Sequence, residues 1–82
     1  MEKNELIKNL GKKISSEILN LPNKEIQPEE ALISSGLIDS FSLVDLAMLV
    51  EDNYDVRIDD TELNVDTFDT LDQLADLILA RM

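Results

Sequence analysis

Few side chains in this sequence could carry out chemistry by themselves. The chain has 18 acidic residues, no histidine and no cysteine, so the commonest general base and the best nucleophile are both absent. Two carboxylates could still act as an acid and a base, but a chain of 82 residues offers little concave interior in which to desolvate them. We therefore expect no catalytic residue, and a protein that is not an enzyme.

One acidic stretch matches part of a calcium-binding loop. Four residues stand at the first, third, fifth and twelfth positions of that pattern: Glu51, Asn53, Asp55 and Glu62. The first position should be Asp, and the sixth, which must turn sharply, is Val56 where the pattern requires glycine. We expect no metal site here, although loose binding of divalent cations by the carboxylates is compatible with the composition.

The charge is distributed unevenly along the chain. The net charge is −11, and residues 1–24 carry five lysines against three glutamates, while residues 25–82 carry 15 acids against two arginines. A negative field of this kind repels nucleic acid, so we expect no nucleic-acid partner. Two interpretations of the acidity stay open: it keeps the protein soluble, or it steers basic partner proteins toward one surface.

The sequence has no feature typical of a secreted or membrane protein. Residues 1–5 lack the basic start and apolar run of a signal peptide. No apolar run approaches the ~20 residues that a membrane span needs, and without cysteine there is no disulfide. We expect one soluble, monomeric, cytoplasmic domain over residues 1–82, with no membrane insertion.

Hydrophobic periodicity predicts the helices that must position any site. A first helix is expected over about residues 2–20, because Ile7, Leu10, Ile14 and Ile18 follow a spacing of three or four. The connection over residues 21–39 follows, and it contains two prolines and a glycine. Loops longer than about 12–15 residues in a small domain are more often functional than idle.

Three further helices complete the prediction. The second is expected over about residues 40–53 with Asp39 or Ser40 as its N-cap, and a short one over about 59–63. The last is expected over about 70–81, where Thr70 and Gln73 fit a capping box. Apart from a short alternation at residues 54–58, nothing indicates a strand. The expected fold is all-α: a small four-helix bundle with a long first loop and a short third helix.

The helix expected over residues 40–53 has apolar residues on two faces. At about 100° per residue, one group faces the core: Leu43, Leu46, Ala47 and Val50. A second group lies nearly opposite, interleaved with acids: Phe41, Val44 and Met48, with Asp45 and Asp52. Single exposed apolar residues are common and carry no meaning. An aligned strip with an acidic rim favours a surface that docks onto other proteins.

The start of this helix carries a resemblance to a known family. The tripeptide Asp39-Ser40-Phe41 lies at the beginning of the second helix, after the long loop. It resembles the phosphopantetheine attachment site of acyl carrier proteins and of peptidyl carrier (thiolation) domains, in which Asp-Ser is followed by a bulky apolar residue. The similarity extends to the helix lengths, the acidic second helix, the short third helix and the last helix, and so covers nearly the whole chain.

The resemblance implies a function and a set of site residues. Ser40 would bear a covalent 4'-phosphopantetheine arm, on whose thiol acyl or aminoacyl groups travel as thioesters, and Asp39 would help to position Mg²⁺ and cofactor during attachment. Five residues match positions that the family presents to partner enzymes: Phe41, Val44, Asp45, Met48 and Asp52. The implied partners are a phosphopantetheinyl transferase, a loading enzyme and downstream acyl-transfer enzymes.

Two positions depart from the pattern of fatty-acid carriers. Ser42 stands where those proteins commonly have an acid, and Leu43 stands where they often have threonine. The segments 36–41 and 61–68 look more like those of stand-alone aminoacyl, D-alanyl or peptidyl carriers and of dedicated biosynthetic carriers. The alternatives are a carrier of fatty-acid synthesis and an unmodified acidic helical adaptor.

Overall fold

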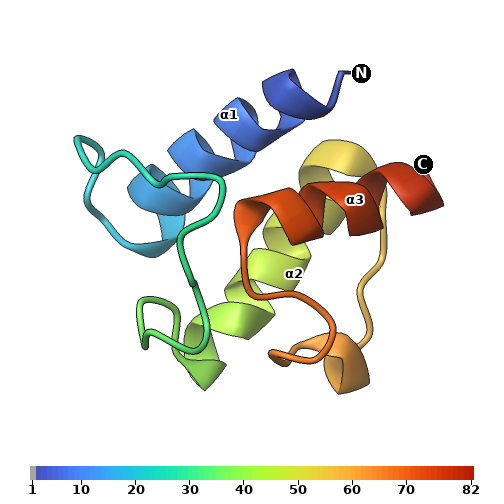
Figure 1. The fold of residues 1–82 in the computed structure, drawn as a ribbon. Helices are drawn as coiled ribbons and strands as arrows, with labels where there is room; N and C mark the ends of the chain where they lie inside the picture. The colour runs from blue at the N-terminus through green and yellow to red at the C-terminus, as the bar shows by residue number, and fades with distance from the viewer. Residues whose placement is uncertain (1) are drawn as a thin grey trace.

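The computed structural model describes residues 2–82, and every element in that part of the chain is helical. Three α-helices are present: α1 (Lys3–Lys13), α2 (Ser40–Tyr54) and α3 (Leu71–Arg81). A π-helical turn, η1 (Ile14–Ile18), continues α1, and a single 3-10 turn, η2 (Asp60–Glu62), lies between α2 and α3. The expected all-α fold with a long first loop is confirmed, with the short third helix reduced to this one turn (Figure 1).

The first helix ends differently from the expectation of a regular helix over residues 2–20. Its last turn is wider than an α-helix, and the Leu19 amide donates to the Ile14 carbonyl at 2.9 Å. Asn20 then takes a left-handed backbone with φ of 53°, a conformation that often ends helices. The buried Ser15 hydroxyl donates to the Lys24 carbonyl at 2.9 Å. This bond folds the connection back over the helix end.

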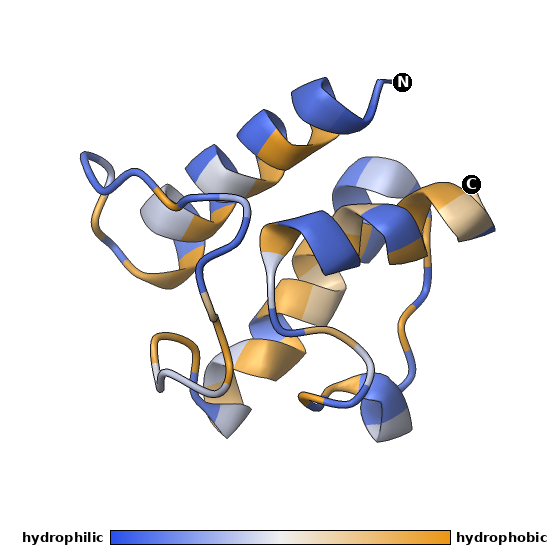
Figure 2. Cartoon of the chain, viewed as in Figure 1, coloured by the Kyte–Doolittle hydropathy of each residue, from blue (hydrophilic) through white to orange (hydrophobic). Residues whose placement is uncertain are grey.

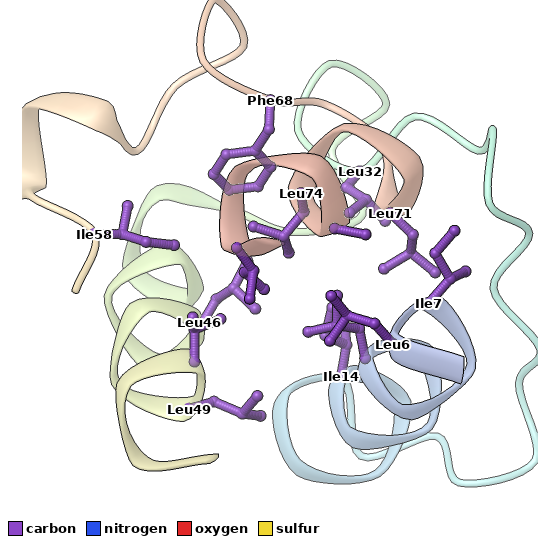
Figure 3. Close-up of a cluster of buried hydrophobic side chains, with 14 of the residues drawn as sticks. Leu6, Ile7, Ile14, Leu32, Leu46, Leu49, Ile58, Phe68, Leu71 and Leu74 are labelled. Atoms are coloured by element: carbon purple, nitrogen blue, oxygen red, sulfur yellow. The ribbon is translucent and has the colours of Figure 1, made fainter. Parts of the chain in front are cut away.

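One hydrophobic core joins the three helices and the loops between them. Figure 2 shows hydrophobic residues along the side of α1 that is turned toward the other helices, and Figure 3 shows side chains from all three helices meeting in one interior. The side chains that are essentially inaccessible include Phe68, Leu6, Leu10, Ile14, Leu32, Ile38, Leu46, Leu71, Leu74, Ile78, Val50 and Val56. Burial of each such side chain contributes about 1.5–3 kcal/mol. Loop residues are therefore part of the core and are held by it.

The core face of α2 is broader than the sequence predicts. Leu43, Leu46 and Val50 are buried as expected, and Leu49, which flanks them, is buried as well. Ala47 and Tyr54 are only partly buried at the margin of this face. The core face therefore extends past the expected stripe on the Leu49 side.

The first turn of α3 forms a modified capping box. The Thr70 hydroxyl oxygen accepts the Gln73 amide at 3.1 Å, as the sequence predicts. In a regular capping box the Gln73 side chain would accept the amide of Thr70. Here it accepts the amide of the preceding residue, Asp69, at 2.7 Å. Thr70 is thus the cap and Leu71 the first helical residue. Among residues 2–82, none of the helices has the length and apolar character needed to cross a membrane.

Candidate functional site

The start of α2 is fixed by Asp39. Its backbone is extended, with φ of −85° and ψ of 176°, and its Oδ1 accepts the amide of Ser42 at 2.8 Å. Asp39, and not Ser40, is therefore the N-cap of the helix. The Ser42 amide bond, with smaller contributions from the Ser42 side chain and the Phe41 amide, lowers the pKa of Asp39 below its ordinary value. The cap is a carboxylate at neutral pH.

Ser40 is the first residue of α2, and its side chain is exposed. Within residues 2–82 its hydroxyl has no hydrogen-bond partner, and the neighbouring carboxylate is occupied by the Ser42 amide. A serine without a base cannot attack a substrate by itself. It can accept a group that another protein transfers, and the amides and dipole at the helix N-terminus favour a negatively charged product there.

The second apolar face of α2 is open to solvent. The exposed fractions are 86% for Phe41, 50% for Val44 and 58% for Met48. Asp45 and Asp52 are also exposed and lie along the same side of the helix. The helix therefore has one buried face and one exposed face, and we call the latter, made of these five residues, the α2 strip. It begins directly beside Ser40.

The long loop before Ser40 is held by Asp69, a residue that sequence reasoning missed. Its Oδ1 accepts the amides of Ile33 and Ser34 at 2.7 and 2.9 Å, and its Oδ2 accepts the Ser34 hydroxyl. The Ser34 hydroxyl bond is the largest of the contacts that lower the pKa of Asp69. Its partners lie 35 and 36 residues away in sequence, so no local pattern could have indicated them.

The stretch that resembles a calcium loop is used for an ion pair. Both carboxylate oxygens of Glu62 contact the guanidinium of Arg81 at the end of α3, with one distance of 3.0 Å. Glu62 also accepts the amide of Asp59 at 3.2 Å. These contacts, led by that with Arg81, lower the pKa of Glu62. The carboxylate at the twelfth loop position therefore ties η2 to α3.

A family model described as a phosphopantetheine attachment site matches residues 12–78. The chain belongs to this family. Its members are carrier proteins whose 4'-phosphopantetheine is attached covalently, and they work with a modifying transferase and with enzymes that handle acyl groups. The expected family, fold and cofactor are confirmed. An exposed serine hydroxyl at a helix N-terminus, with a carboxylate beside it, fits the attachment of this cofactor.

The relatives include carriers of more than one kind. An acyl carrier protein from Acidothermus cellulolyticus is 31% identical over 77 residues, which cover 92% of this chain and 90% of that protein. A meromycolate extension acyl carrier protein from Mycobacterium leprae is 38% identical over 50 residues, 61% of this chain and 44% of that protein. A D-alanyl carrier protein from Bacillus pumilus is 37% identical over 49 residues, 60% of this chain and 63% of that protein.

A solved structure agrees with the fold. The crystal structure of an acyl carrier protein from Thermotoga maritima superposes with a TM-score of 0.74 at 26% sequence identity. The match covers 99% of this chain and 91% of that chain. The carrier fold thus extends over essentially all of this carrier protein, including both long connections.

Proposed function

We propose that Ser40 carries the 4'-phosphopantetheine arm and that the protein delivers acyl or aminoacyl groups to partner enzymes. The observation that carries the proposal is the exposed, unbonded Ser40 hydroxyl in the first turn of α2, inside the region matched by the family model. In the attachment step, the hydroxyl loses its proton and a bond forms between Ser40 Oγ and the phosphorus next to the pantetheine of coenzyme A. The bond from that phosphorus to the bridging pyrophosphate oxygen breaks, and the remainder of coenzyme A leaves. Once attached, the arm supplies a thiol that holds cargo as a thioester.

Asp39 and the helix N-terminus have separate roles in this proposal. The carboxylate of Asp39 fixes the first turn by accepting the Ser42 amide, and it adds a negative group beside Ser40 that would help to place Mg²⁺ and coenzyme A. The dipole of α2 stabilises the phosphodiester on Ser40 by an amount typical of helix termini, about 0.3–1 kcal/mol. The catalysis itself comes from the transferase.

We infer that the α2 strip is the surface that partner enzymes recognise. Phe41, Val44 and Met48 supply exposed apolar area for affinity. Asp45 and Asp52 supply negative charge that speeds the approach of basic partners and sets their orientation. The strip starts at the attachment site, so an enzyme bound to it would have the arm within reach.

For the cargo, we propose a dedicated biosynthetic or aminoacyl-type carrier. Ser42 supports this choice because it stands where fatty-acid carriers commonly have an acid, and the similarity to a D-alanyl carrier protein points the same way. A carrier of fatty-acid synthesis is the second candidate, supported by the 31% identity to an acyl carrier protein over 92% of the chain. Loading of the modified protein by an enzyme that activates amino acids, compared with loading by an acyl transferase, distinguishes the two.

The attachment site is tested by intact mass after incubation with coenzyme A and a phosphopantetheinyl transferase. We expect the wild type to gain one phosphopantetheine and Ser40→Ala to gain none, with the helical circular dichroism of the variant unchanged. Ser42→Ala is the matched control, because it removes a hydroxyl from the same turn and keeps the amide that bonds Asp39.

Two results would contradict the proposal in different ways. A mass gain in Ser40→Ala would place the cofactor on another residue. No gain in the wild type, with a transferase that modifies another carrier in the same tube, would favour the unmodified adaptor.

A further inference from the structure

The loop that leads into Ser40 is a compact unit. The Ile38 amide donates to the Leu32 carbonyl at 2.9 Å, and the Gly36 amide donates to the Ile33 carbonyl at 3.1 Å. Gly36 makes the turn possible, because its φ of 80° is one that side chains disfavour. Residues 32–38 are thereby closed on themselves and end directly at Asp39. The loop is therefore directly continuous with the N-cap of α2.

Asp69 connects this unit to the start of α3. Besides the three side-chain bonds from Ile33 and Ser34, its carbonyl accepts the Leu32 amide at 2.6 Å. Three consecutive loop residues thus donate to a single residue. Because Asp69 also donates its own amide to Gln73 in the first turn of α3, it is fixed on the helix side of the contact.

We propose that Asp69 is a positioning residue for the modification site, holding residues 32–38 on α3 so that Ser40 is presented in one place. This inference rests on the proposed attachment at Ser40. The first buried residue of α2 is Leu43, so Ser40 and Phe41 lie outside the part of the helix that the core holds. Their position depends on the chain before them, which the core holds through the buried Leu32 and Ile38 and which Asp69 holds through its hydrogen bonds.

The anchor should affect recognition more than turnover. If Asp69→Ala lets the loop move, only a fraction of molecules present Ser40 correctly, and the apparent affinity for the transferase falls by that fraction. We expect the KM for the carrier to rise about threefold to tenfold, while kcat changes by less than about twofold. A general loss of folded protein would instead lower the amount of modifiable carrier.

Asp69→Asn separates hydrogen-bond geometry from charge. Both backbone amides bind Oδ1, so an amide oxygen can replace it, and the Asn NH₂ can donate to a rotated Ser34 hydroxyl. We expect Asp69→Asn to restore most of the wild-type KM. Asp66→Ala is the control for charge: it removes a carboxylate from the same connection, and Asp66 is exposed with no hydrogen bond within the described part of the chain.

Amide hydrogen exchange in the unmodified protein gives a readout that does not depend on the transferase. In Asp69→Ala we expect the Ser34 and Ile38 amides to exchange at least about tenfold faster, while amides of α1 keep their wild-type rates. Ser34→Ala, which removes only the hydroxyl bond to Oδ2, should show a smaller change in the same direction. It serves as the test if Asp69→Ala does not fold.

The outcomes can be told apart. A KM for Asp69→Ala equal to that of Asp66→Ala, or an Asp69→Asn variant as impaired as Asp69→Ala, would overturn the positioning role. Unchanged exchange at Ile38 would overturn the anchor itself. Absence of modification in the wild type would refute attachment at Ser40, and the exchange rates would still decide whether Asp69 holds the loop.

Discussion

Leu46 and Met48 belong to the same helix and have opposite environments. Leu46 has no exposed surface, whereas 58% of Met48 is exposed. Substitution by alanine removes the same number of non-hydrogen atoms from each, so the pair compares two faces of α2 at nearly equal loss of side-chain size. Leu46→Ala leaves a cavity in the core and should lower the free energy of unfolding by about 2–5 kcal/mol. Met48→Ala should change it by no more than about 0.5 kcal/mol.

The size of the Leu46 effect is large for this chain. At about 0.05–0.15 kcal/mol per residue, a domain of this length has a total stability of about 4–12 kcal/mol. For a small domain each kcal/mol moves the Tm by about 4–8 °C, so Leu46→Ala should melt at least about 8 °C lower. Urea unfolding followed by helical circular dichroism measures both variants, and the denaturant slope checks that the transition remains two-state.

The transferase assay separates the pair a second time. Met48→Ala should remain folded and yet be a poorer substrate, because Met48 belongs to the proposed recognition strip. If Met48→Ala destabilises the protein as much as Leu46→Ala, both faces of α2 are buried and the α2 strip is wrong. If Leu46→Ala costs less than about 0.5 kcal/mol, the assignment of the core face fails.

Two further predictions concern stability. Gly11→Ala should raise the free energy of unfolding by about 0.5–1 kcal/mol, because alanine is the better helix former. A Cβ at Gly11 would lie 3.4 Å from Leu71 Cδ1, at the near limit of an ordinary van der Waals contact. Thermal melts of the wild type and the variant measure the change in stability. Asp66→Asn and Asp69→Asn have equal charge, but only Asp66→Asn keeps the Asp69 carboxylate, whose pKa Ser34 lowers. A carboxyl group with a lowered folded pKa contributes stability above the ordinary Asp pKa of about 4 and loses it as the pH falls through the folded value. Asp66→Asn should therefore be the more stable variant at neutral pH, and the difference should shrink below about pH 4, as measured by urea unfolding.

These two predictions have clear counter-results. A lower Tm for Gly11→Ala would mean that α1 and α3 are packed too closely for a methyl group. A difference between the two asparagine variants that stays constant from neutral pH to about pH 3 would mean that ionisation of Asp69 does not stabilise the fold.

Local patterns predicted the features that depend on local geometry. The period of an α-helix was enough to separate Leu46 from Met48, and the Asp-Ser pair before an apolar run indicated a cap at the start of α2. The burial of Leu49 was missed because it lies beside the expected stripe, where only the actual neighbours decide. The apolar spacing does not indicate the π-helical end of α1 either, because that spacing is compatible with a regular α-helix over the same residues.

Contacts between residues far apart in the chain could not be predicted from the sequence, and the reason is physical. Asp69 and Glu62 are two of 18 acidic residues, and no local pattern indicates their partners in distant parts of the chain. Their partners are chosen by the packed fold, which brings Ser34 to one and Arg81 to the other. Glu62 fits a weak calcium pattern in the sequence, whereas its partner in the fold is Arg81, 19 residues further on and outside any local pattern.

Because Asp69 follows Ile33 by 36 residues, the loop before Ser40 acquires its support late in the synthesis of the chain. At about 5–20 residues per second, roughly 2–7 s separate the synthesis of this loop from that of its anchor. Pro28 also lacks its hydrogen-bond partner until Asp72 has been made, because its carbonyl accepts the Asp72 amide at 3.1 Å. The contacts that hold the loop before Ser40 therefore form only after residues 69–72 have left the ribosome. We therefore expect efficient modification at the proposed site, Ser40, only after α3 has been completed.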